Sequence, residues 1–264
     1  MSSRHGEETP IAGEALFGYY RRYYRDALGI PGWQDLVAVR LADEVYERQR
    51  LTRLEQVLGR TVAGLRLLNV GCGTGGFNVC AAKAGAIAWG VDASAEATAL
   101  AAERVGRGRI CRAGAEALPF PSGRFDLVYC YSTLEHVQDA ACAIREMVRV
   151  LRSGGLLYLH TPSRWACFES HYKVFWLPGL PAPLQKCYLR LRGRPTVFLD
   201  SLRLLSLTQC RQLVEAAGAR VARVLDDGAT RPVGGPLWPV VRLYYRLLRI
   251  HPYLELLAVR ESHK

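Results

Sequence analysis

The chain has 264 residues, half of them hydrophobic, and carries 35 Lys and Arg against 24 Asp and Glu, a formal net charge of +11. This length allows one α/β domain with additions and a substantial core. Apolar runs stay shorter than the roughly 20 residues that a membrane-spanning helix needs, and residues 1–10 lack the apolar core of a secretory signal.

The positive charge suits an anionic partner, either nucleic acid or an acidic lipid surface. It comes almost entirely from arginine, since only four lysines occur, and a GC-rich gene gives the same bias without selection for a basic surface. The eight cysteines are scattered without a C-x-x-C pair, so neither a zinc site nor a disulfide framework is expected. We therefore expect a cytoplasmic protein, with peripheral contact to an anionic membrane as an open alternative.

A helical N-terminal cap, residues 13–60, is expected after a disordered leader of residues 1–12. Asp35–Leu58 shows the apolar spacing of a long amphipathic helix. Its expected core contacts are Leu36, Val39, Val45, Leu51, Leu54 and Leu58. The preceding aromatic and cationic run, Tyr19–Tyr24, favours a helix that packs its tyrosine rings; a cover over a binding cleft or a membrane contact is the alternative.

The most informative segment is a glycine-rich turn between an expected strand, Leu65–Val70, and an expected helix, Gly76–Ala84. Glycine lets backbone N–H groups approach a ligand closely, and the helix directs its positive end at that ligand. Asp92 follows Gly71 by 21 positions, after the next expected strand, Ala86–Val91, where a carboxylate can accept both hydroxyls of a ribose. The turn therefore predicts a nucleoside-binding half-site.

The glycines alone leave the nucleoside open. Gly71, Gly73 and Gly76 satisfy the dinucleotide pattern G-x-G-x-x-G. Gly71, Gly73 and Gly75 equally satisfy G-x-G-x-G, the pattern of S-adenosylmethionine (SAM) sites. A tight turn without any ligand is a third interpretation, so the downstream sequence has to separate them.

Strands and helices go on alternating to residue 161, which predicts a doubly wound parallel sheet with right-handed crossovers. The expected elements are helix Ala95–Arg104, strands Arg109–Arg112 and Phe125–Cys130, helix Gln138–Leu151 stopped by Gly154-Gly155, and strand Gly155–Thr161. Residues 162–205 are rich in proline, tryptophan and arginine and are expected as an insertion over the cleft. The last expected elements are helix Ser206–Ala217, strand Arg220–Leu225, helix Val240–Leu248 and strand Leu254–Arg260, with the two strands forming an antiparallel pair.

Four motifs after the glycine turn decide between the nucleosides. They are Ala115-Glu116-Ala117-Leu118-Pro119-Phe120-Pro121, Phe125-Asp126-Leu127-Val128, Leu134-Glu135-His136-Val137 and Leu151-Arg152-Ser153-Gly154-Gly155-Leu156-Leu157. In this order and spacing they resemble the class I SAM-dependent methyltransferases, and most closely the branch with the ubiquinone- and menaquinone-pathway enzymes. The resemblance is strong over residues 65–161 and weak for the closing strands. It implies an α/β fold with a doubly wound, Rossmann-like seven-stranded sheet in residues 61–264, a substrate cap at 162–205, and SAM as cofactor.

The resemblance also implies cofactor-binding positions. The turn residues Gly71, Cys72, Gly73 and Gly75 would lie against the methionine part of SAM, Asp92 would bind the ribose hydroxyls, Ala93, Gly114 and Ala115 would meet the adenine, and Tyr131 would lie near the transferred methyl group. A tyrosine of the core is the alternative for Tyr131. Many relatives have an acidic residue where Gly114 stands, so one polar adenine contact is missing unless Glu116 substitutes for it.

A second departure concerns metal binding. Ubiquinone-type relatives carry E-x-x-E-H, which can bind a divalent metal, whereas this chain has Ser132 in place of the first carboxylate. Only Glu135 and His136 remain, so no metal is expected.

Methyl transfer from a sulfonium needs positioning and a deprotonated acceptor. Histidine supplies a base near neutral pH, and His136 is the candidate, with Glu135 to orient it; the start of a helix is the alternative role of both. His171 is a second candidate base, and His160 is expected to be structural.

The class of methyl acceptor is narrowed by two motifs that the chain lacks. Cys130-Tyr131-Ser132-Thr133 is not the N-P-P-Y type of motif used on nucleic-acid bases, and no Pro-Cys pair for cytosine chemistry occurs. The sequence therefore favours O-methylation of a small-molecule, lipid, quinone-like or glycolipid acceptor. A SAM-binding partner or regulatory protein without turnover is the alternative, and an RNA methyltransferase is a third, supported by charge alone.

Overall fold

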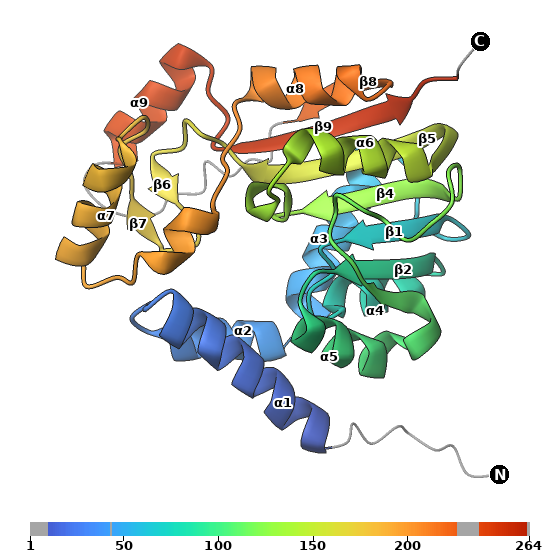
Figure 1. Ribbon diagram of the computed structural model, residues 1–264, viewed down its shortest axis with the longest axis horizontal. Coiled ribbons are helices and arrows are strands. Elements are labelled where there is room, and N and C mark those ends of the chain that lie inside the picture. The colour runs from blue at the N-terminus through green and yellow to red at the C-terminus, as the bar shows by residue number, and fades with distance from the viewer. Residues whose placement is uncertain (1–9, 43, 226–237, 263–264) are drawn as a thin grey trace.

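The computed structural model describes residues 10–42, 44–225 and 238–262, and its centre is a seven-stranded sheet of order β3-β2-β1-β4-β5-β9-β8 (Figure 1). The strands are β1 Arg66–Val70, β2 Ile87–Asp92, β3 Ile110–Arg112, β4 Phe125–Tyr131, β5 Leu151–Pro162, β8 Ala219–Leu225 and β9 Tyr253–Arg260. The first five are parallel, and β9 pairs antiparallel with β5 and β8. The predicted doubly wound α/β sheet with an antiparallel closing pair is confirmed.

Helices cover both faces of this sheet. One face packs against α6 Ala140–Val150 and α8 Leu207–Ala216, and the other against α3 Glu44–Leu58 and α4 Gly76–Lys83. The chain order reverses between β1 and β4, which leaves a crevice at their carboxyl ends.

Side-chain caps place the starts of three helices. Ser94 caps α5 Ala95–Val105 and Asp139 caps α6, each accepting a backbone N–H of the first turn. Ser206 and Gln209 form a reciprocal capping box at the start of α8. These polar residues explain why the helix starts lie close to those expected.

The predicted cause of the end of helix Gln138–Leu151, a stop at Gly154-Gly155, is wrong. Helix α6 ends at Val150 and β5 begins directly at Leu151, so Gly154-Gly155 lies inside the strand. The register shifts there, because Phe125 pairs with Leu151 whereas Leu127 pairs with Leu156. Gly154, at φ +69°, lets the longer segment bulge out of the ladder.

The N-terminal region is helical but broken. It consists of α1 Pro10–Arg21, a π-helix at Arg22–Ala27, α2 Trp33–Leu41 and α3. Residues 1–9 of the expected leader lie outside the described residues, whereas residues 10–12 belong to α1, so that boundary is corrected. The expected continuous helix Asp35–Leu58 is interrupted after Leu41, and the helical phase restarts in α3. Of the expected core contacts, Val39 and Val45 are exposed, and Val37 is buried instead.

The insertion packs against the N-terminal region. It contains the two-stranded sheet of β6 Phe168–Glu169 and β7 Val174–Phe175, helix α7 Ala182–Leu191 and a 3-10 turn at Val197–Ser201. Leu28 and Ile30 pack with Tyr172, Trp176 and Leu189 in a separate apolar cluster. Helix α9 Trp238–Leu248 is attached to this end, since the Tyr245 hydroxyl accepts the Cys167 N–H at 2.7 Å (Figure 1). None of the described helices is long and apolar enough to span a bilayer.

A buried ion pair joins helix α3 to the last strand. Both oxygens of Glu255, which is fully buried, accept hydrogen bonds from Arg53 at 3.0 and 2.7 Å, and the Tyr158 hydroxyl donates a third bond at 2.8 Å.

We expect Arg53→Ala to lower the free energy of unfolding by about 3 kcal/mol, because it leaves the Glu255 carboxylate buried without its cation. Denaturant unfolding followed by circular dichroism measures the change, with Arg60→Ala, an exposed arginine just after the same helix, as the control. Equal stability of the two variants would contradict a structural role for the pair.

Candidate functional site

A cavity of about 800 Å³ lies at the carboxyl ends of β1, β2 and β4. Its walls come from the glycine turn, the loops after β2, β3 and β4, the N-terminal tyrosines and the insertion. Of the predicted site residues, Gly71, Cys72, Gly73, Asp92, Ala93, Gly114, Ala115, Tyr131 and His136 line it, whereas Gly75 and Glu135 do not. The structure therefore gathers segments from residue 19 to residue 253 around one space.

The glycine turn is held by hydrogen bonds that it donates to strand β2. The N–H groups of Gly71 and Cys72 both donate to the Val91 carbonyl, at 2.8 and 2.9 Å. Gly71 has φ +76°, and a Cβ atom there would lie 2.0 Å from Oγ1 of Thr133. Position 71 therefore requires glycine for both its dihedral angle and the close approach of the loop after β4.

Asp92 organises this turn. One carboxylate oxygen accepts the Gly73 N–H and the other accepts the Ser94 N–H, both at 2.9 Å. Each oxygen keeps a lone pair free for a further donor. The carboxylate thus lies fixed in the cavity wall, where it can accept hydroxyl groups of a ligand.

Gly75, which is not among the residues that line the cavity, has a packing role. It is the left-handed N-cap of α4, at φ +81°, and a Cβ atom would approach Cβ of Ala101 in α5 to 2.9 Å. The turn needs this glycine to bring α4 and α5 together.

The loop after β3 brings Glu116 into the cavity wall beside Ala93, Gly114 and Ala115. Oε1 of Glu116 accepts the Gln138 N–H at 2.8 Å, while Oε2 faces Gly114, 3.1 Å from where a Cβ atom would be. The second oxygen is therefore available beside the position at which relatives carry an acid.

The tyrosine run Tyr19–Tyr24 covers the cavity, which was the less favoured interpretation of the sequence. Tyr19, Tyr20, Tyr23 and Tyr24 all belong to the lining, and the Tyr20 hydroxyl lies 2.7 Å from Oγ1 of Thr74 in the glycine turn. The rings also pack against one another, so the run serves both roles.

A buried charged group on the N-terminal helices was missed by sequence reasoning. Arg50 donates to Glu47 at 2.8 Å and to the Tyr129 hydroxyl at 3.1 Å, and its guanidinium lies 4.0 Å from the centre of the Tyr131 ring. Arg40 pairs with the same glutamate at 3.3 Å. Both arginines line the cavity, but no local motif marks them, because they precede the glycine turn in an ordinary helical pattern.

Tyr131 lies in the cavity wall as predicted. Its ring stacks on His160 with centroids 4.0 Å apart, and burial raises the pKa of its hydroxyl well above 10. The hydroxyl therefore stays protonated at neutral pH.

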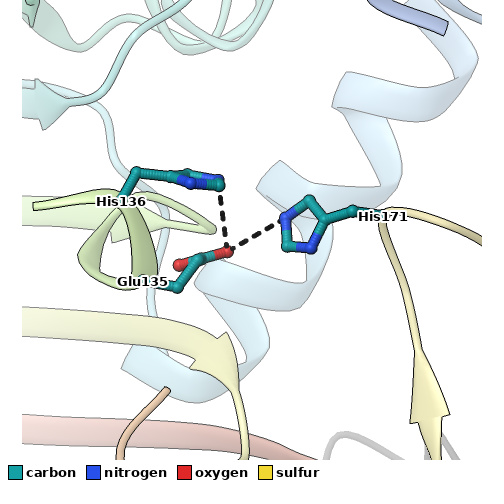
Figure 2. Close-up of side chains that lie close together, drawn as sticks. All are labelled: Glu135, His136 and His171. Carbon is teal, nitrogen blue, oxygen red and sulfur yellow. Dashed lines mark ion pairs between the residues drawn. The ribbon is translucent and has the colours of Figure 1, made fainter. Parts of the chain in front are cut away.

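Glu135 and His136, the residues expected to activate an acceptor, form a cluster with His171 (Figure 2). His136, at the end of a 3-10 turn after β4, lines the cavity. Glu135 is fully buried beneath it, and its Oε1 lies 4.0 Å from Nε2 of His136 and 3.6 Å from Nε2 of His171. The predicted orienting bond from Glu135 to His136 is thus absent at this distance, and His171, between β6 and β7 of the insertion, lies closer to the carboxylate.

Burial and charge set the protonation of this cluster. Burial lowers the pKa of His136 and outweighs the attraction of Glu135, so His136 is neutral near pH 7. Burial would also lower the pKa of His171, but its contacts with Glu135 and Glu169 raise it to about 9. Burial opposes ionisation of Glu135, yet the contact with His171 and the electrostatic interactions with both histidines hold its pKa below the usual value.

Comparison with known proteins agrees with this geometry. Residues 68–159 match the family described as methyltransferase domain. A probable S-adenosylmethionine-dependent methyltransferase of Mycolicibacterium smegmatis is 29% identical over 186 residues, which cover 70% of this chain and 63% of that protein. The ubiquinone biosynthesis O-methyltransferase of Methylococcus capsulatus is 36% identical over 109 residues, 39% of this chain and 46% of that protein. The chain thus spans less than two thirds of the length of these relatives.

Solved structures share the fold. Magnesium protoporphyrin IX methyltransferase of Synechocystis, with bound SAH, superposes with a TM-score of 0.55 at 17% identity and covers 97% of this chain and all of that chain. The 4+2-cyclase SpnF gives a TM-score of 0.54 at 25% identity, with 85% of this chain and 83% of that chain covered. The matched domain, the strand order and the glycine turn with Asp92 show that residues 68–159 form a methyltransferase domain of the SAM-dependent type.

Proposed function

We propose that the chain transfers the methyl group of SAM to an oxygen atom of a lipid, quinone-like or glycolipid acceptor. The observation that carries the proposal is that the turn held by Asp92 and the imidazole of His136 line the same cavity. The turn proposed to bind SAM and the proposed base therefore border the same cavity.

The cofactor would lie along the carboxyl ends of β1 and β2. The turn at Gly71–Gly73 would meet the methionine part, with Arg40 and Arg50 adding positive charge for its carboxylate. Asp92 would accept the ribose hydroxyls, and Ala93, Gly114 and Ala115 would border the adenine, with Oε2 of Glu116 for its amino group. Gly75 would shape this turn through its packing against α5.

His136 would accept the proton of the acceptor hydroxyl, since it is the histidine of the predicted motif that faces the cavity. We expect His136→Ala to lower the rate of methyl transfer by about 10²–10⁴-fold and to leave SAM affinity within a factor of about three, because the proposed cofactor contacts lie elsewhere. Single-turnover assays with labelled SAM and calorimetry measure the two effects. His251→Ala, a half-buried histidine outside the lining, is the control; equal turnover of both variants would remove His136 from the mechanism.

A lipid acceptor is supported by the surface at the end of the molecule that carries the insertion (Figure 1). Helix α9 exposes Val240, Leu243, Leu247 and Leu248, and the insertion exposes Leu177, Leu184 and Leu191. Arginines lie among these positions in both helices, and apolar side chains mixed with cations suit an anionic membrane surface. We therefore propose a cytoplasmic protein in peripheral contact with a membrane.

The acceptor class is tested by incubating the protein with methyl-labelled SAM and either a lipid extract or total RNA. Label in the lipid fraction is expected. Label confined to RNA would contradict the choice of acceptor while leaving the methyltransferase activity intact.

Binding of SAM without methyl transfer is the second candidate function. It is favoured by the absence of an acid at Gly114 and by the similarity to a structure named a cyclase. SAM affinity in the micromolar range together with no labelled product from any fraction would favour this candidate.

A further inference from the structure

We propose that Glu135, His136 and His171 bind a divalent transition-metal ion, Zn²⁺ or Co²⁺, at the boundary between the sheet domain and the insertion. The donor atoms of the three side chains all lie within 4.8 Å of one another. Figure 2 shows both imidazole rings with a nitrogen turned toward the same carboxylate oxygen. Donors of a tetrahedral zinc site are about 3.3 Å apart. The 3.6 and 4.0 Å separations therefore need to close by less than about 1 Å, and no donor pair by more than about 1.5 Å.

One of these donor atoms is buried with two long ion-pair contacts but no hydrogen bond from the described residues. Oε2 of Glu135 accepts the Thr161 hydroxyl at 2.9 Å, whereas Oε1 receives no hydrogen bond from the residues that the structure describes. Its ion pair with His171 is long, at 3.6 Å, so part of the cost of burying this oxygen remains. Because Oε1 is the atom that faces both histidines, a cation at this point would satisfy it.

The carboxylate of Glu169 orients His171, the third proposed ligand. Nδ1 of His171 lies 2.7 Å from Oε1 of Glu169, and Oε2 of Glu169 accepts the Tyr172 N–H at 2.6 Å. A proton kept on Nδ1 makes Nε2, the atom that faces Glu135, the coordinating nitrogen, and binding of the ion releases the Nε2 proton to solvent. This is the arrangement in which a carboxylate orients a histidine toward a metal ion.

The donor set selects the kind of ion. Two imidazoles and one carboxylate suit Zn²⁺ or Co²⁺, while Mg²⁺ and Ca²⁺ prefer oxygen ligands alone. The side chain of His136 is 30% exposed and lines the cavity, so a further coordination position faces the space proposed for the acceptor.

A role of the ion in methyl transfer rests on the proposed function. An ion that binds there lowers the pKa of a coordinated hydroxyl, and the acceptor proton then goes to solvent rather than to His136. With the ion present, His136 acts as a ligand, and in the metal-free protein it remains the proposed base.

Metal binding is tested on the full-length untagged protein after removal of metals with EDTA. Titration with Co²⁺ is expected to give one equivalent bound, with visible ligand-field bands and no thiolate charge-transfer band, which excludes the cysteines. His171→Ala and Glu135→Gln should each weaken binding on the order of 100-fold, and Glu169→Gln by about 10-fold. The matched control, His251→Ala, should leave the titration unchanged.

SAM affinity, measured by calorimetry without cobalt, shows whether each variant is folded. Failure to bind one equivalent of Co²⁺, or equal affinity in the wild type and both ligand variants, would overturn the metal site. These titrations contain neither SAM nor acceptor, so that outcome would leave the proposed methyl transfer untouched. Absence of SAM binding in the wild type would instead contradict the proposed function alone.

Discussion

Replacement of Asp92 by alanine is expected to reduce the affinity for SAM by about 100-fold or more, the largest loss we expect from a single side chain. Two charge-assisted hydrogen bonds to ribose hydroxyls contribute about 1.5–3 kcal/mol each. The same carboxylate also fixes the glycine turn through the N–H groups of Gly73 and Ser94, so its removal loosens the turn as well. Calorimetric titration with SAM and with its demethylated product measures the loss.

The variant needs a control for net charge. Glu103→Ala removes one negative charge from the exposed face of α5 and does not touch the cavity, so its affinity should equal that of the wild type. Asp92→Asn keeps one acceptor oxygen and should be intermediate. If Asp92→Ala binds SAM as tightly as Glu103→Ala, the proposed placement of the cofactor is wrong.

Much of this site could be predicted because its elements are local in sequence. The strand, turn and helix from Arg66 to Lys83 lie within 20 positions, and the hydrophobic run and the glycines together determine their geometry. Asp92 follows from the same logic, since parallel strands β1 and β2 end at one edge of the sheet. The wrong placement of Gly154-Gly155 arises because a glycine pair can stop a helix or form a bulge, and only strand pairing decides between them.

The other walls of the cavity could not be predicted because they are set by tertiary packing. Tyr20 meets Thr74 across 54 positions, and His171 meets Glu135 only because the insertion folds back over β4. Arg50 belongs to helix α3, where the spacing of apolar residues predicts the face toward the core. That spacing does not predict where the side chain of a buried arginine lies. The sequence offered only two candidate donors and therefore predicted no metal, and the third candidate, His171, lies in a segment without fixed periodicity.

Gly71→Ala is expected to abolish SAM binding and to destabilise the fold by about 2–5 kcal/mol. Positive φ costs a residue with a Cβ atom about 1–2 kcal/mol, and overpacking adds about 1–3 kcal/mol. The overpacking arises because the new methyl group would lie 2.0 Å from Oγ1 and 2.5 Å from Cγ2 of Thr133. Thr133 cannot withdraw freely, since its hydroxyl donates to the carbonyls of Val70 and Tyr131.

Gly64 provides the matched control, because it has φ +75° and nothing within 4 Å of a Cβ position. Gly64→Ala therefore carries the backbone penalty without the clash, and it should lose only about 1–2 kcal/mol and keep its affinity for SAM. Chemical denaturation and calorimetry on both variants separate the two contributions. If Gly71→Ala is no less stable than Gly64→Ala, then the loop after β4 moves away at little cost, and the close approach of Thr133 is not what shapes the floor of the cofactor site.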